Sequence, residues 1–96
     1  MKKIRIAVIG CGRISKNHFD SIKIHEDNIE LVSVCDINQE TMSEHKEKYG
    51  IEGYTDLEKM LVSESLDLVA ICTPSGIHAD QTNICAKYGV NVMTEK

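Results

Sequence analysis

The sequence lacks most of the features that mark membrane, metal-binding and nucleic-acid-binding proteins. It contains no tryptophan, one phenylalanine and one proline in 96 residues. No apolar run approaches the roughly 20 residues that a bilayer-spanning helix needs. Acidic residues outnumber lysine and arginine by 15 to 11, so a basic face for nucleic acid is not expected. With 42% hydrophobic and 27% charged residues, the composition is that of one ordinary globular domain.

The four cysteines form no metal-binding or disulfide pattern. Cys11, Cys35, Cys72 and Cys85 are spaced by 24, 37 and 13 residues, and no C-x-x-C pair occurs. We therefore expect free, mostly buried thiols in a reducing compartment, and no metal site. The apolar segment 6–9 is too short for a secretion signal, so we expect a cytoplasmic protein.

Short apolar runs alternate with amphipathic stretches along the whole chain. Strands are predicted at 4–9, 30–35, 67–72 and 90–93, with a short extended piece at 53–54. Helices are predicted over 13–25, 38–49, 55–62 and 77–88. This alternation predicts one α/β domain over residues 1–96, a doubly wound parallel sheet of the Rossmann type with strand order 3-2-1-4-5.

Several of the predicted helices have recognisable ends. Asn38 is the predicted N-cap of the second helix, and Gly50 closes it. Residues 55–58 (Thr-Asp-Leu-Glu) match a capping box with Thr55 as the cap of the third helix. In the last helix, three residues recur at helical spacing and are predicted to face the core: Ile84, Cys85 and Tyr88.

The strongest functional signal is the glycine turn at residues 10–15 (Gly-Cys-Gly-Arg-Ile-Ser) between the first strand and the first helix. Gly10 permits the tight turn, and Gly12 has no Cβ, so a pyrophosphate can approach the backbone. Arg13 and Ile14 follow at the helix N-terminus, whose free N–H groups favour an anion. Ser15 stands where a dinucleotide-binding fingerprint has its third glycine, and a glycine turn of this kind also occurs in other α/β proteins.

Two other nucleotide-binding classes use a similar turn. Methyltransferases usually carry an acidic residue just before the glycines, where this chain has Val8 and Ile9. Flavoproteins usually have small residues after the glycines, where this chain has Arg13 to Lys16. The turn therefore favours a nicotinamide dinucleotide.

Asp36 provides the second functional signal, because it directly follows the second strand and lies 21 residues after Ser15. A carboxylate there can accept both hydroxyls of the adenosine ribose and would repel a 2′-phosphate. Ile37 offers no cation to hold such a phosphate, so we predict NAD rather than NADP. The alternative role of Asp36 is an Asx turn before the next helix, and both roles are compatible.

The ends of the fourth and fifth strands provide the third signal. Residues 72–78 lie beside the first strand, at the switch point of the sheet where ligands bind. Pro74 would hold this loop over the cofactor, while His78 is equally explained as a solvated residue at a helix start. The residues predicted to flank the nicotinamide ribose are Thr73, Pro74, Ser75 and His78. Glu95 and Lys96 follow the fifth strand, although a terminal lysine is ordinarily a solvated tail.

Taken together, these residues resemble the glucose–fructose oxidoreductase and inositol 2-dehydrogenase (Gfo/Idh/MocA) family. The resemblance rests on 6–15 with His18, on Cys35 and Asp36, on 73–75 with His78, and on Glu95 and Lys96. It implies an NAD(P)-dependent sugar or cyclitol oxidoreductase, with a larger C-terminal substrate domain that these 96 residues do not include. In the family, the lysine of a Glu-Lys-Pro motif contacts the nicotinamide region and the reacting hydroxyl. The resemblance thus implies Lys96 as a catalytic residue, with Glu95 beside it in the cofactor site.

Within the family, residues 2–20 and 70–78 are similar to bacterial UDP-N-acetyl-glucosaminuronate 3-dehydrogenases, which act in surface polysaccharide synthesis. This similarity implies a sugar or nucleotide-sugar substrate. We expect a homo-oligomer for the intact enzyme, no nucleic-acid or membrane partner, and no activity from the 96-residue chain alone. The alternative is a non-catalytic NAD-sensing module, against which Glu95 and Lys96 argue, because a sensor needs no lysine at the reacting end.

Overall fold

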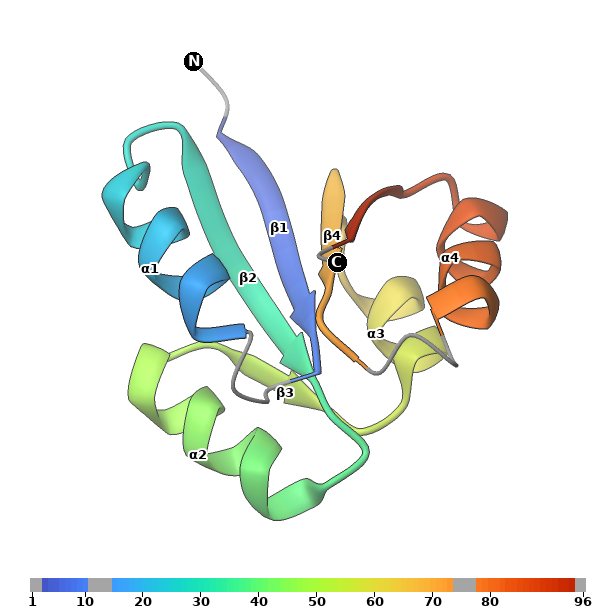
Figure 1. Cartoon of the computed structure of the whole chain (residues 1–96), viewed down its shortest axis with the longest axis horizontal. Coiled ribbons are helices and arrows are strands. Elements are labelled where there is room, and N and C mark those ends of the chain that lie inside the picture. Colours follow the sequence, from blue (N-terminus) through green and yellow to red (C-terminus); the bar gives the residue numbers. More distant parts are fainter. Residues whose placement is uncertain (1–2, 11–14, 74–77, 95–96) are drawn as a thin grey trace.

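The computed structural model describes residues 3–10, 15–73 and 78–94. The elements in chain order are β1 (Ile4–Ile9), α1 (Ser15–Ile24), β2 (Ile29–Cys35), α2 (Gln39–Tyr49), β3 (Glu52–Tyr54), α3 (Leu57–Ser63), β4 (Leu68–Ile71), α4 (His78–Lys87) and β5 (Asn91–Thr94). All strand pairs are parallel and the order is β3-β2-β1-β4-β5 (Figure 1). The predicted Rossmann-type sheet and its 3-2-1-4-5 order are confirmed, with element ends shifted by one or two residues.

The helices cover both faces of the sheet, which gives the domain two hydrophobic cores (Figure 1). On one face, Phe19 and Ile22 of α1 and Met42 of α2 pack against the sheet. On the other face, α3 and α4 supply Met60, Leu61 and Cys85. The central strand β1 is buried from both sides, which explains why it is apolar at consecutive positions rather than alternating.

Side-chain caps set the ends of two helices. Asn38 Oδ1 accepts a hydrogen bond from the backbone N–H of Thr41 at 3.0 Å, and Gly50 adopts the left-handed conformation at φ 62°, so both predicted ends of α2 are confirmed. The cap of α3 is Asp56 rather than Thr55, because its carboxylate accepts from the N–H groups of Glu58 and Lys59. A carboxylate also interacts more favourably than a hydroxyl with the helix dipole. Every helix in the described ranges is too short or too polar to traverse a lipid bilayer.

The position of Tyr88 differs from the prediction. Ile84 and Cys85 face the core as expected, but Tyr88 is 37% exposed. Helix α4 ends at Lys87, and Gly89 turns the backbone with φ 74°, so Tyr88 no longer follows the helical period. Its ring lies 6.0 Å from the Lys87 ammonium instead of in the core.

Backbone hydrogen bonds tie the carboxyl ends of the strands together at one edge of the sheet. The Gly10 N–H donates to the Cys35 carbonyl at 2.7 Å, which joins the end of β1 to that of β2. The Cys72 N–H donates to the Ile9 carbonyl at 2.8 Å, which joins β4 to β1. These bonds hold the segments after β2, β1 and β4 side by side, and the functional signals of the sequence fall on these segments.

Candidate functional site

A pocket of about 310 Å³ lies at the carboxyl edge of the sheet. This volume is within the roughly 300–1,000 Å³ of small-molecule sites, and the place is where open α/β sheets bind their ligands. The pocket is lined by residues at or just after the carboxyl ends of β1, β2, β3 and β4, and by residues of α3 and α4. The lining residues are Ile9, Gly10, Cys35, Asp36, Ile37, Thr55, Leu57, Cys72, Thr73 and Gln81.

Gly10 occupies a position where a side chain would be both strained and crowded. Its φ is 86°, a conformation that residues with a side chain rarely adopt. A Cβ there would also lie 2.8 Å from Thr73 Cγ2, 3.0 Å from Thr73 N and 3.1 Å from the Cys72 carbonyl carbon. The missing side chain therefore serves both the turn and a close approach of the segment after β4.

The Asp36 carboxylate lies in the pocket and also organises the backbone after β2. Its Oδ1 accepts a hydrogen bond from the Asn38 N–H at 2.8 Å, which is the Asx turn that the sequence leaves open as an alternative. Ile37 beside it is 90% exposed and lines the same pocket. Among the lining residues that the structure describes, none is a lysine or arginine. The electrostatics of this end therefore favour ribose hydroxyls over a phosphate.

The opposite side of the pocket is formed by Thr73 and Gln81. Thr73 comes two residues after the end of β4, and its hydroxyl donates a hydrogen bond to Gln81 Oε1. Gln81 belongs to α4, so this bond connects the helix to the segment that leads into it. The helix thereby supports one wall of the pocket.

Cys35, which lines the pocket, is a protonated thiol at neutral pH. Burial is the main cause that raises its pKa from 9.0 to about 12, and the carboxylates of Asp36 and Asp56 raise the pKa further in the same direction. The side chain is 4% exposed. A thiol in this state acts as a small apolar group and not as a nucleophile.

The structure brings four of the predicted site residues to this one pocket: Gly10, Asp36, Ile37 and Thr73. His78 is the first residue of α4. The other predicted residues lie outside the described ranges, and they are Gly12, Arg13, Ile14, Pro74, Ser75, Glu95 and Lys96.

Six lining residues were not among the predicted site residues. Ile9, Cys35 and Cys72 directly adjoin predicted ones in the sequence, whereas Thr55, Leu57 and Gln81 do not. Thr55 directly follows β3, whose carboxyl end lies at the same sheet edge, so the strand order could have indicated it. Gln81 lies in the helix that directly follows the predicted segment 72–78, and this nearness in the sequence could have indicated it. No local pattern predicts Leu57 as a pocket residue, because an apolar residue at the start of a helix is equally expected to pack in the core.

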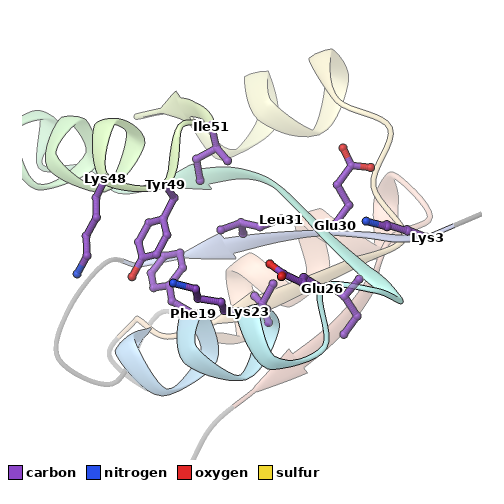
Figure 2. A pocket seen from close by; sticks show the side chains of 11 residues that line it. Lys3, Phe19, Lys23, Glu26, Glu30, Leu31, Lys48, Tyr49 and Ile51 are labelled. Atoms are coloured by element: carbon purple, nitrogen blue, oxygen red, sulfur yellow. The ribbon is translucent and has the colours of Figure 1, made fainter.

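A second and larger pocket, of about 490 Å³, lies between α1 and α2 over β2 (Figure 2). Phe19 and Tyr49 form one wall, with their rings stacked 4.5 Å apart, and Leu31 lies at the floor. Lys23 and Lys48 stand at its rim. None of the predicted site residues that the structure describes lines this pocket. The functional signals of the sequence thus belong to the smaller pocket at the strand ends.

Residues 4–96 match the model of a family described as "Oxidoreductase family, NAD-binding Rossmann fold" (GFO_IDH_MocA). The chain belongs to this family. The resemblance that the motifs indicate is therefore confirmed, together with NAD as the cofactor that the family description names.

Solved structures of two WlbA dehydrogenases share this fold closely. The protein from Chromobacterium violaceum is 43% identical with a TM-score of 0.96, and the comparison covers 100% of this chain and 28% of that one. The protein from Bordetella pertussis is 40% identical with a TM-score of 0.96, covering 99% of this chain and 30% of that one. Both were solved in complex with NADH and UDP-GlcNAcA.

A curated relative is named for a different substrate. The 4-carboxy-2-hydroxymuconate-6-semialdehyde dehydrogenase of a Sphingobium strain is 36% identical over 93 residues, which are 96% of this chain and 29% of that protein. The chain thus spans less than a third of the length of each of these proteins.

Proposed function

We propose that this chain binds NAD across the carboxyl ends of β2, β1 and β4, as the cofactor domain of a dehydrogenase acting on a hydroxyl of a sugar or nucleotide sugar. The observation that carries the proposal is the pocket that gathers Gly10, Asp36 and Thr73 at the switch point of the sheet. In this arrangement Asp36 binds the adenosine ribose. The dinucleotide then passes over Gly10, at the end of the central strand β1.

The described residues fit a dinucleotide. Gly10, at the end of β1, lets the segment after β4 approach closely, which brings the ends of β1 and β4 together where a pyrophosphate would cross. Asp36 offers a carboxylate acceptor at the β2 side, and Ile37 gives an exposed apolar surface suited to an adenine ring. Thr73 lines the pocket at the β4 side, where its hydroxyl donates a hydrogen bond to Gln81.

Each side of the site has a separate task. When bound, NAD supplies a nicotinamide ring that accepts or donates hydride. Asp36 orients the adenosine half, and the segment from Thr73 to His78 orients the nicotinamide half. Lys96 and Glu95 follow β5, whose carboxyl end lies at the same edge. We assign to Lys96 contact with the reacting hydroxyl, and to Glu95 a place beside the cofactor, on the strength of the family resemblance.

The substrate site is proposed to lie in a second domain of a longer protein. The length of the relatives supports this proposal, because these 96 residues correspond to only 28% to 30% of each relative. A nucleotide sugar related to UDP-GlcNAcA is the preferred substrate, since the WlbA proteins that hold it are 40% and 43% identical to this chain. The intact enzyme is proposed to be a cytoplasmic homo-oligomer.

Calorimetric titration of the chain with NAD and with NADP tests the cofactor assignment. We expect NAD to bind more tightly than NADP. The variant Asp36→Ala should lose about 1–3 kcal/mol of NAD binding, because a charged acceptor is removed, and should bind NADP relatively better. Asp27→Ala is the matched control: Asp27 is exposed and precedes β2, at the opposite edge of the sheet. NADP binding that equals or exceeds NAD binding in the unmodified chain would contradict the role of Asp36.

A further inference from the structure

We infer that Gln81 is a positioning residue of the cofactor site, which holds Thr73 against Gly10 and thereby shapes the nicotinamide half of the NAD site. This inference rests on the proposed function. Gln81 belongs to none of the motifs that the sequence analysis identified. Its side chain lines the pocket and accepts a hydrogen bond from Thr73.

The methyl group of Thr73 fills the space beside Gly10. A Cβ at Gly10 would lie 2.8 Å from Thr73 Cγ2, so the threonine methyl already occupies the place that a side chain would need. Gly10 after β1 and Thr73 after β4 are thus in direct contact. Any rotation of the Thr73 side chain would change the surface against which Gly10 lies.

Gln81 determines the rotation of that side chain. The Thr73 hydroxyl donates to Gln81 Oε1, while the methyl faces Gly10, so two substituents of the Thr73 Cβ have defined neighbours. A threonine χ1 has three staggered positions, and this pair of contacts selects one of them. Thr73 lies two residues beyond the last residue of β4. Helix α4 supplies the rigid support through Gln81.

The strand order places the hydrogen-bonded pair of Thr73 and Gln81 at the nicotinamide end of the cofactor site. Because β1 lies between β2 and β4, Asp36 and Thr73 stand on opposite sides of Gly10. Neighbouring strands are about 4.8 Å apart, so the two ends are separated by roughly 10 Å. With the adenosine ribose on Asp36, a dinucleotide crosses Gly10 and carries its nicotinamide half past Thr73. Loss of Gln81 should therefore affect NAD but spare a ligand that ends at the pyrophosphate.

The test compares NAD with ADP, which has the adenosine and the two phosphates but no nicotinamide half. Gln81→Met removes the acceptor and keeps the length of the side chain. We expect the Kd for NAD to rise about 3- to 10-fold, the effect of one lost hydrogen bond, while the Kd for ADP changes less than about 2-fold. Thr73→Val keeps the shape and removes the donor, and should give the same pattern. The double variant should be no weaker than either single variant, since both remove the same bond.

Two further variants separate positioning from general destabilisation. Asn83→Met is the control on the exposed side of the same helix and should leave both Kd values unchanged. Gln81→Glu retains an acceptor for Thr73 and keeps a test available if Gln81→Met does not fold. A uniform loss of NAD and ADP binding, or additive effects in the double variant, would overturn the positioning role. An unmodified chain that binds neither ligand would instead overturn the proposed function itself.

Discussion

Replacing Gly10 by alanine should impose two separable costs, one from the backbone conformation and one from lack of space. The φ of Gly10 is 86°, so an alanine there must adopt a left-handed conformation. The added methyl would also lie 3.0 Å from Thr73 N and 3.1 Å from the Cys72 carbonyl carbon. Both of these are backbone atoms, which cannot move aside by rotation of a side chain.

Gly50 allows the two costs to be measured apart. It has φ 62° at the end of α2, and a Cβ built on it meets no atom within 4 Å. Gly50→Ala should therefore cost only the conformational term, about 1–2 kcal/mol. Gly10→Ala should cost that amount plus about 1–3 kcal/mol for overpacking, and hence roughly 2–5 kcal/mol in all.

Urea unfolding of the two variants beside the unmodified chain checks these values. A melting curve provides a second measure, because 1 kcal/mol lowers the Tm of a domain of roughly this size by about 4–8 °C. Gly10→Ala should also weaken NAD binding, whereas Gly50→Ala should not. If both variants lose the same stability to within about 0.5 kcal/mol, the close contact between Gly10 and the segment after β4 does not constrain the fold.

Three further outcomes are expected. Ser33→Ala should raise the free energy of unfolding by about 1 kcal/mol in urea titrations, because the fully buried Ser33 hydroxyl has no hydrogen-bond partner among the described residues. A loss of stability in this variant would contradict the prediction. The pKa of the Cys35 thiol is 9.0 in the unfolded chain and about 12 in the folded one, so the folded state binds more protons between these values. The free energy of unfolding should therefore fall as the pH rises from 9 to 12, and Cys35→Ala should make this fall less steep. Met93 on the edge strand β5 is 40% exposed, so sedimentation velocity should show concentration-dependent self-association that Met93→Lys suppresses. A monomer at all concentrations would refute this prediction.

Much of the fold follows from patterns that lie within a few residues of each other. Apolar runs such as Leu68–Ile71 predict buried parallel strands, and the amphipathic stretches between them predict the crossover helices. Right-handed crossovers then leave one favoured strand order, which the sheet has. The N-cap Asn38 was also predictable, because its side chain bonds to a backbone N–H only three residues away. The choice of Asp56 over Thr55 was not, since two adjacent residues could each cap the helix.

The chain by itself determined the positions of Gly10 and Asp36, because the turn chemistry and the strand-end carboxylate are visible in consecutive residues. Only the tertiary structure decided which residues contact Gly10 and complete the pocket around Asp36. The contact between Gly10 and Thr73 joins residues 63 positions apart and depends on the register in which Ile9 pairs with Ile71. The bond from Thr73 to Gln81 likewise depends on how α4 packs after its strand. Such contacts arise from the packing of whole elements, and no local periodicity encodes them.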